Sequence, residues 1–241
     1  MSNKNIIIIG ASSGIGKELA KVFGEKGYTV GITARRLELL SQTAQELPGA
    51  SFVKRMDVST TDEAINILEQ LIEEMGGINI IVINAGIGFV NPELEWGKEK
   101  STIDVNVAGF TAMATTAMNH LIKQGFGHLV GISSISAIRG SSHAPAYSAT
   151  KAFMSHYLEA MRFKVLKMKI PVTVTDIQPG FVDTAMAKGD KLFWVAPVRT
   201  AALQIYEAIE KKKTHAYITK RWRLIAWLLK LTPTRFLAKY Y

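Results

Sequence analysis

The sequence predicts an α/β fold in which one doubly wound parallel sheet is covered by helices on both faces. Short runs rich in β-branched residues alternate with longer stretches of helical periodicity along the chain. The runs are almost continuously apolar, as is typical of strands buried on both faces. The 241 residues fit one domain, and no linker rich in Pro, Gly or Ser divides them. We therefore expect one domain over residues 1–219 and a basic, aromatic helical extension over residues 220–241.

The order of the elements follows from these two periodicities. The first strand contains four consecutive isoleucines, and the β-branched runs as a group are Asn5–Ile9, Tyr28–Thr33, Ser51–Arg55, Ile78–Ile83, His128–Ser133, Val172–Ile177 and Ala216–Thr219. Apolar residues recur at helical spacing between them, in Ile15–Lys26, Leu37–Glu46, Thr61–Met75, Lys98–Gln124, Ala146–Met168 and Val198–Glu210. Right-handed crossovers between parallel strands place the ligand crevice at the carboxyl ends of the strands.

The composition excludes several kinds of site. The chain has no cysteine, so disulfides and thiolate metal sites are impossible, and its five histidines show no metal-binding spacing. The net charge of +9 arises from residues 211–241, which hold nine Lys and Arg and no acid, whereas the first 210 residues balance 20 bases against 20 acids. Nucleic-acid binding by the body is therefore not expected. The N-terminus enters the first strand too early for a signal peptide, so a cytoplasmic protein is expected.

A glycine-rich turn joins the first strand to the first helix. It reads Gly10-Ala11-Ser12-Ser13-Gly14-Ile15-Gly16, a spacing that differs from the commoner G-x-G-x-x-G. Glycines let the backbone turn tightly and approach a pyrophosphate at a helix N-terminus. After the first strand of a doubly wound sheet, this pattern predicts a Rossmann-like dinucleotide site, with contacts from Gly10, Ser12, Ser13, Gly14, Ile15 and Gly16.

The end of the second strand indicates which dinucleotide is bound. An acid normally holds the 2′-hydroxyl of NAD there, but this chain reads Thr33-Ala34-Arg35-Arg36, and the first acid is Glu38. Arginine suits a 2′-phosphate because its guanidinium offers charge and paired donors. We expect NADP(H) rather than NAD, with Arg35 the first contact and Arg36 the second. The alternative is that both arginines begin a solvated helix.

Two further segments are expected in the same crevice. Asp57 and Val58 follow the third strand, where the adenine ring would lie. Asn84, Ala85 and Gly86 follow the fourth strand, where small residues let the chain pass close to a cofactor.

Tyr147 and Lys151 lie four residues apart in a predicted helix, with Ser134 thirteen positions upstream of the tyrosine. This spacing places the phenol and the ammonium on one helix face, about one turn apart. A phenol with a pKa of about 10 is a poor acid–base catalyst at neutral pH, and a nearby positive charge would lower that pKa. Such a pair also occurs by chance on helix surfaces, so the pattern alone leaves both interpretations open.

Taken together, these segments closely resemble the short-chain dehydrogenase/reductase (SDR) family in its form of about 250 residues. The matching motifs stand in the family's order: Gly10-Ala11-Ser12-Ser13-Gly14-Ile15-Gly16, Asn84-Ala85-Gly86, Asn106, Ser134, Tyr147-Ser148-Ala149-Thr150-Lys151 and Pro179-Gly180-Phe181-Val182-Asp183-Thr184. The resemblance implies an NADP(H)-dependent oxidoreductase that interconverts a carbonyl and an alcohol. Alternatives are a 3-oxoacyl or steroid-type reductase and a non-catalytic protein that senses NADP(H). The physiological direction of the reaction stays open.

The resemblance also assigns roles to the catalytic residues. Tyr147 would exchange a proton with the carbonyl oxygen, and Ser134 would hydrogen-bond that oxygen. Lys151 would lower the phenol pKa and hold the nicotinamide ribose. Asn106 would anchor a water beside Lys151, although an asparagine inside a helix can also bond a backbone carbonyl. Ser133 competes with Ser134, and the thirteen-residue spacing favours Ser134.

The last matching motif is expected to complete the cofactor site. Pro179, Gly180, Val182 and Thr184 would contact the cofactor, with Thr184 at the carboxamide. One departure is small: the family often has Thr before its first glycine, where this chain has Ile9.

Substrate and subunit contacts are expected from apolar segments. Few charges occur in Ile87–Glu95, Ile135–Ala144 and Ala185–Pro197, which favours an apolar, lipid-like substrate, although the same residues could close a lid on the core. The resemblance implies a homodimer or homotetramer through the helices Lys98–Gln124 and Ala146–Met168. A dimer is preferred because the C-terminal segment would obstruct a second interface.

The C-terminal segment combines bases with aromatic and aliphatic residues. Its apolar run Leu224–Leu229 is far too short to span a membrane, and Pro233 separates Lys220–Leu231 from a second piece, Thr234–Tyr241. Such a segment can lie in a membrane interface, or it can pack on its own domain or on a partner subunit. The sequence leaves these alternatives open.

Overall fold

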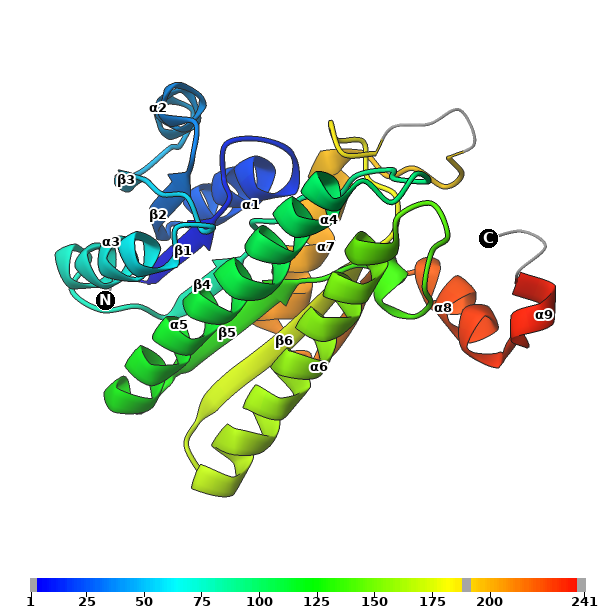
Figure 1. Cartoon of the computed structure of the whole chain (residues 1–241). Coiled ribbons are helices and arrows are strands. Elements are labelled where there is room, and N and C mark those ends of the chain that lie inside the picture. The colour runs from blue at the N-terminus through cyan, green and yellow to red at the C-terminus, as the bar shows by residue number, and fades with distance from the viewer. Residues whose placement is uncertain (1–3, 188–191, 238–241) are drawn as a thin grey trace.

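The computed structural model describes residues 4–187 and 192–237 of the chain. Its seven parallel strands form one sheet in the order β3-β2-β1-β4-β5-β6-β7 (Figure 1). The strands are β1 (Asn5–Ile9), β2 (Thr29–Ala34), β3 (Ser51–Arg55), β4 (Ile80–Ile83), β5 (Gly127–Ile132), β6 (Val172–Pro179) and β7 (His215–Ile218). This arrangement confirms the predicted doubly wound fold.

Helices cover both faces of the sheet (Figure 1). They are α1 (Gly14–Glu25), α2 (Leu37–Gln45), α3 (Thr61–Glu74), α4 (Trp96–Ile103), α5 (Phe110–Gln124), α6 (Pro145–Met168), α7 (Val198–Glu210), α8 (Trp222–Leu231) and α9 (Thr234–Leu237). The expected single helix Lys98–Gln124 is interrupted, because a π-helical turn, η1 (Asp104–Gly109), separates α4 from α5. A short 3-10 turn, η2 (Ile135–Ala137), follows β5.

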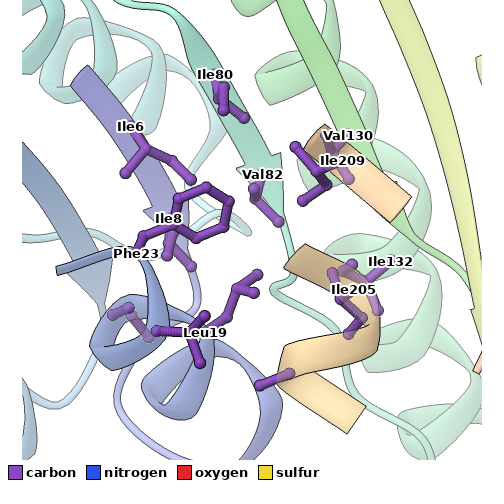
Figure 2. Close-up of a cluster of buried hydrophobic side chains, with 14 of the residues drawn as sticks. Ile6, Ile8, Leu19, Phe23, Ile80, Val82, Val130, Ile132, Ile205 and Ile209 are labelled. Carbon is purple, nitrogen blue, oxygen red and sulfur yellow. The ribbon is translucent and has the colours of Figure 1, made fainter. Parts of the chain in front are cut away.

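The four isoleucines of β1 divide the core into two layers. Because side chains alternate along a strand, Ile6 and Ile8 point to one face, and Ile7 and Ile9 to the other. Figure 2 shows the first layer, where Ile6 and Ile8 pack with side chains of α1 and α7. The second layer is built from α3, α5 and α6. All four isoleucines are fully buried, as expected for an interior strand of the sheet.

The site is positioned by the point at which the strand order reverses. β1 pairs with β2 on one side and with β4 on the other, so the chain leaves their carboxyl ends in opposite directions. Backbone amides extend the pairing past the strand ends: Gly10 and Ala11 donate to the Thr33 carbonyl at 2.8 and 3.0 Å, and Asn84 and Ala85 donate to the Ile9 carbonyl at 2.9 and 2.7 Å. The glycine-rich turn and the segment after β4 therefore lie side by side.

The C-terminal helices follow β7 and lie together at one side of the molecule (Figure 1). Trp222, Ala226 and Leu229 of α8 form a small core with Ile135 of η2. Part of the extension therefore packs on its own domain. Within the described residues, no helix is long and apolar enough to cross a membrane. Residues 188–191 of the expected substrate segment and residues 238–241 of the expected second piece lie outside the described residues.

Candidate active site

The glycine-rich turn forms a cradle that side chains would fill. Gly10 and Gly14 have φ angles of +93° and +56°, which L residues rarely adopt. A Cβ on Gly10 would lie 2.6 Å from the Ala85 amide nitrogen, and one on Gly16 would lie 2.2 Å from the Gly10 carbonyl oxygen. The Asn84 amide donates to that same carbonyl at 2.7 Å and holds the turn in place. Because these positions carry no side chain, the backbone of the turn can come close to a bound ligand.

The N-terminus of α1 opens at this cradle. Its N-cap, Ser13, makes no side-chain capping bond, so the first backbone amides remain available to an anion such as a pyrophosphate. Thr184 lies above the turn, because a Cβ on Gly14 would be 3.1 Å from its Cγ2 atom. Ile15, in contrast, packs against the first core layer. The cradle and the helix terminus fit a dinucleotide.

Of the two arginines after β2, the structure brings Arg36 to the glycine-rich turn. Its Nη2 atom donates to the hydroxyls of Ser12 and Ser13 at 3.1 and 3.2 Å. Arg35 is exposed, and its backbone carbonyl accepts a hydrogen bond from Arg55 Nε at 3.3 Å. Arg36 is the N-cap of α2, and this position places its guanidinium at the loop. The expected order of the two arginines at a 2′-phosphate stays a prediction.

The segment after β3 is held in place by hydrogen bonds of Asp57 and by the packing of Val58. Asp57 Oδ1 accepts hydrogen bonds from the backbone amide and the hydroxyl of Ser59, at 3.0 and 2.7 Å. Val58 is buried, and a Cβ on Gly109 would lie 2.6 Å from its carbonyl oxygen.

The segment after β6 is fixed by packing on the C-terminal side of the site. Pro179 ends β6, and the Gly180 amide donates to the Ile218 carbonyl at 2.6 Å. Val182 is buried and pairs with Ala196 in an isolated bridge.

Tyr147, Ser134 and Lys151 meet at the carboxyl end of β5. Pro145 occupies the first turn of α6, where its missing amide costs nothing, and it starts the helix two residues before Tyr147. The Ser134 side chain lies close enough to the Tyr147 phenol to act on its pKa as a hydrogen-bond donor. Because Ser134 Oγ accepts from the Ser136 amide at 3.1 Å, its own proton is free to be donated. The structure thus assembles the three residues singled out in the sequence.

Burial dominates the pKa values of this group. Burial raises the pKa of Tyr147, and the hydrogen bond from Ser134 opposes this only in part. Burial also lowers the pKa of Lys151 to about 8, and the carboxylate of Asp176 acts in the opposite direction. The expected effect of Lys151 on the phenol pKa stays a prediction. Lys151 Nζ lies 5.8 Å from the phenol ring centroid and donates to the Ile132 carbonyl at 3.0 Å.

Asn106 lies in the π-helical turn and is fully buried. Its amide donates to the Ile87 carbonyl at 2.7 Å and to the Thr150 hydroxyl at 3.1 Å. Its Oδ1 atom accepts from the Ile87 amide at 2.9 Å. The Asn106 side chain thus holds the backbone of the loop after β4. The alternative considered from the sequence, a bond to a backbone carbonyl of its own helix, is not the contact that forms. π-turns often mark functional positions, and this one aims Asn106 at the loop beside Lys151.

Two glycines after β4 make room for the catalytic side chains. A Cβ on Gly86 would lie 3.2 Å from Lys151 Nζ and 3.2 Å from Asn106 Oδ1. A Cβ on Gly88 would lie 2.4 Å from Cδ2 of the Tyr147 ring. Gly88 was not among the predicted site residues, although a second glycine two residues after Gly86 indicates that this strand end passes close to another side chain.

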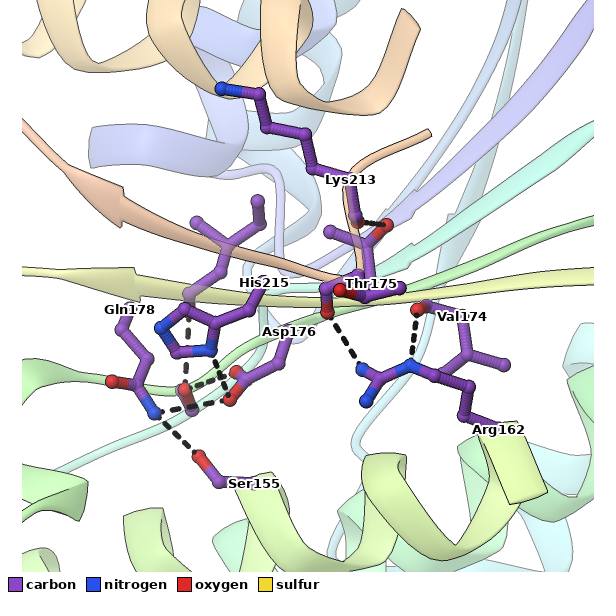
Figure 3. A network of polar contacts seen from close by, with 11 residues as sticks. Ser155, Arg162, Val174, Thr175, Asp176, Gln178, Lys213 and His215 are labelled. Atoms are coloured by element: carbon purple, nitrogen blue, oxygen red, sulfur yellow. Dashed lines mark hydrogen bonds and ion pairs between the residues drawn. The ribbon is translucent and has the colours of Figure 1, made fainter. Parts of the chain in front are cut away.

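A buried carboxylate, Asp176, is the centre of a polar network next to the catalytic group (Figure 3). Asp176 of β6 accepts hydrogen bonds from Ser133 Oγ at 2.5 Å and from Gln178 Nε2 at 3.1 Å, and His215 Nδ1 lies 3.6 Å from it. Burial acts to raise its pKa, but the contacts with His215 and Ser133 outweigh burial and lower it. Ser133 is thus committed to Asp176, which leaves Ser134 as the serine at Tyr147.

The apolar segments expected to bind substrate divide into two groups. Phe89 and Val90 are exposed beside the loop after β4. Ile135 and Ile138 instead pack against α8. Phe193 and Trp194 join Trp222 in an aromatic cluster at the same side of the site.

Comparisons with known proteins agree with this geometry. A family model described as short chain dehydrogenase matches residues 4–192. An uncharacterized oxidoreductase of Myxococcus xanthus is 34% identical over 191 residues, which cover 77% of this chain and 75% of that protein. A 3-oxoacyl-(acyl-carrier-protein) reductase of Rattus norvegicus is 32% identical over 188 residues, covering 77% of this chain and 78% of that protein. The crystal structure of a short chain dehydrogenase/reductase from Burkholderia phymatum in complex with NAD has a TM-score of 0.85 at 18% identity, covering 94% of this chain and 92% of that one.

Proposed function

The chain belongs to the short-chain dehydrogenase family, and from that premise we propose that it is an NADP(H)-dependent oxidoreductase that interconverts a carbonyl and an alcohol on an apolar, lipid-like substrate. The observation that carries the proposal is the placement of Tyr147 and Lys151 at the carboxyl end of β5, where Lys151 Nζ lies 5.8 Å from the phenol ring centroid and the Ser134 side chain acts on the phenol. A proton donor, a hydrogen-bond donor and a cation at the carboxyl end of β5 suit the reduction of a carbonyl.

The residues of the site divide the work as follows. The cofactor, when bound, supplies or accepts hydride. Ser134 holds the substrate oxygen and stabilises the negative charge that develops on it. Tyr147 gives its proton to that oxygen, and its raised pKa keeps the phenol protonated at neutral pH until charge develops. Lys151 places a positive charge beside the phenol ring, 5.8 Å from its centroid, which favours the phenolate that forms when the proton is given up.

The NADP(H) preference rests on the residues after β2. The segment offers two arginines and no acid to a 2′-substituent, and the Arg36 guanidinium already lies at the hydroxyls of the glycine-rich turn. A 2′-phosphate would receive charge-assisted hydrogen bonds there, whereas a 2′-hydroxyl would find no carboxylate. The proposed cofactor site is completed by the segments after β3, β4 and β6, namely Asp57, Val58, Asn84, Ala85, Gly86, Pro179, Gly180, Val182 and Thr184.

The substrate class rests on the apolar side chains around the catalytic group. Phe89, Val90, Phe193 and Trp194 are at least partly exposed near it and carry no charge. The rat relative acts, by its name, on 3-oxoacyl groups, which favours an acyl thioester as a second candidate substrate. We propose a panel of ketones, aldehydes and acyl thioesters with NADPH as the measurement that decides between them.

Replacing Tyr147 tests the function directly. Tyr147→Phe should lower kcat by about a hundredfold to ten-thousandfold, because general acid catalysis is lost, while NADPH binding measured by fluorescence is retained. Tyr157→Phe is a matched control on the same helix. Its phenol hydrogen-bonds the Thr115 hydroxyl at a distance of 2.9 Å, and this contact lies outside the site. Undiminished turnover in Tyr147→Phe would refute the assignment. NADPH binding without turnover of any panel substrate would favour the sensing protein.

We also propose that the protein forms a homodimer through α5 and α6. Large apolar side chains stand exposed along α6, namely Phe153, Phe163, Leu166 and Met168. Burying these side chains against a second copy would remove them from water.

A further inference from the structure

Helix α8 carries two apolar stripes on opposite faces. Trp222, Ala226 and Leu229 are 2%, 1% and 9% exposed and pack on the domain. The second stripe consists of side chains that are 60–71% exposed: Leu224, Trp227, Leu228 and Leu231. These four follow the spacing i, i+3, i+4 and i+7, so they form one continuous row along the helix. We call them the outer stripe.

The outer stripe is too regular to be scattered surface leucines. A helix on the surface of a domain needs one apolar face to pack, and α8 already has one. Phe236 of α9, 66% exposed, adds a further large apolar side chain in the next helix. A contiguous exposed patch of this kind marks an interaction surface.

The charges around the outer stripe identify the kind of partner. Residues 211–241 carry nine Lys and Arg and no acid, whereas the rest of the chain is balanced. Arg223 and Lys230 are exposed and seven residues apart, so they line one flank of the outer stripe, and Arg235 follows in α9. A second copy of this chain would bring the same positive charges face to face. An apolar row flanked by bases instead matches an anionic lipid surface, with the row in the acyl boundary and the bases at head groups.

The helix is held rigidly in the orientation that presents this row. Arg139 donates to the carbonyls of Leu229, Lys230 and Thr232 at 2.8, 3.2 and 3.1 Å, so it fixes the C-terminus of α8. At the other end, Arg221 donates to the Trp194 carbonyl at 2.8 Å and lies over its ring. These two arginines are committed to the domain, and the bases on the flank of the outer stripe are not.

We propose that α8 docks the protein on anionic membrane surfaces through its outer stripe and the bases beside it. Docking needs no change in the fold, because the face that packs on the domain is the opposite one. The same helix contacts Ile135 and the Trp194 segment, so the docked protein would present the substrate side of the site to the lipid. That last consequence rests on the proposed function, whereas docking itself does not.

Vesicle sedimentation tests the proposal. The wild-type protein should bind vesicles of phosphatidylcholine with phosphatidylglycerol and leave vesicles of phosphatidylcholine alone largely unbound. Trp227→Ala combined with Leu228→Gln should weaken binding about tenfold or more. Trp96→Ala is a matched control, because Trp96 is 69% exposed and Trp227 is 70% exposed, and it should bind as the wild type does.

The contribution of charge needs its own pair of variants. Arg223→Gln with Lys230→Gln should weaken binding about fivefold for each base removed. Lys211→Gln with Lys213→Gln removes the same charge at the start of β7, the opposite end of that strand from α8, and should have a much smaller effect. Equal losses in both pairs would reduce the interaction to net charge and overturn docking by α8.

The orientation can be read from tryptophan quenching. Brominated phosphatidylcholine mixed with phosphatidylglycerol should quench the emission of the wild-type protein, and Trp227→Phe should keep the binding but lose most of the quenching. Binding with no such difference would overturn the proposal. A second outcome would also overturn it: substitutions in the outer stripe change the molar mass measured by light scattering, and the protein does not bind vesicles. That result would identify the outer stripe as a contact between subunits. Turnover of a water-soluble ketone, measured on the same variants, should be unchanged, which separates failure of docking from failure of the proposed function.

Discussion

Replacing Gly88 by alanine should displace the catalytic phenol. The added Cβ would lie 2.4 Å from Cδ2 and 2.9 Å from Cγ and Cε2 of the Tyr147 ring. Carbon atoms in contact prefer about 3.5–4.0 Å, so the ring and the loop must separate by about 1 Å. The loop cannot easily move, because Asn106 binds both the amide and the carbonyl of neighbouring Ile87. Most of the displacement should therefore fall on Tyr147.

The size of the effect follows from that displacement. A misplacement of about 1 Å in a reacting group costs about a hundredfold in rate, so kcat of Gly88→Ala should fall by about that factor. Overpacking should cost about 1–3 kcal/mol of stability, which leaves the protein folded. The glycine-rich turn is not touched, so the affinity for NADPH should be unchanged.

The assay compares kcat with a carbonyl substrate and the NADPH dissociation constant by fluorescence. Gly97→Ala is the matched control, because a Cβ at that position meets nothing within 4 Å, and it should turn over normally. A Gly88→Ala protein with the wild-type kcat would refute the reasoning, since it would show that the loop, and not the ring, gives way. Equal losses in Gly88→Ala and Gly97→Ala would refute it as well, because the effect would then not be specific to the ring.

Two further substitutions test the cofactor site and the buried lysine. Arg36→Ala should raise the KM for NADPH by about tenfold to a hundredfold, because charge-assisted hydrogen bonds are lost, and should leave the KM for NADH nearly unchanged. Its effect should exceed that of Arg35→Ala. Equal effects on both cofactors in steady-state kinetics would contradict the assignment. Burial lowers the pKa of Lys151 from 10.5 to about 8, so the unfolded chain holds this proton more tightly than the folded protein does. The resulting cost of about 3 kcal/mol applies in full below pH 8 and fades as the pH rises from about 8 to about 10.5. Lys151→Met should therefore raise the free energy of unfolding at pH 7 while abolishing turnover, and its advantage in urea titrations should shrink over that range; a pH-independent difference would contradict this account.

The sheet could be predicted from the sequence because each strand repeats the same local signal. β1 and β3 begin and end where expected, and the apolar runs are long enough to place every other strand within a few residues. The interruption of the long helix could not be predicted in this way. A π-helical turn inserts one residue without changing composition, and the periodicity of Lys98–Gln124 still looks helical on both sides of it.

The chemistry of the site could be predicted only as far as residue identity carries it. Tyr147, Ser134 and Lys151 are marked by motif spacing, and the structure brings them together. The direction in which the pKa of Tyr147 shifts depends instead on how deeply the phenol is buried and on where the Lys151 ammonium points. The spacing of residues in the sequence determines neither of these. Which of Arg35 and Arg36 lies at the loop is likewise not contained in the motif, since it depends on where α2 begins.

The C-terminal segment shows why two alternatives drawn from a sequence need not exclude each other. Packing on the domain and contact with a membrane use the same residue types, and the sequence offered them as competitors. In α8 they occupy opposite faces: Trp222 fills the space above Gly180, where a Cβ would come within 2.0 Å of its ring, while Trp227 faces outward. Removing residues 220–241 would therefore uncover Ile135 and disturb the site at the same moment as it removed the outer stripe. Loss of both binding and turnover in such a truncation would say nothing about either, which is why substitutions confined to the outer stripe are the decisive experiment.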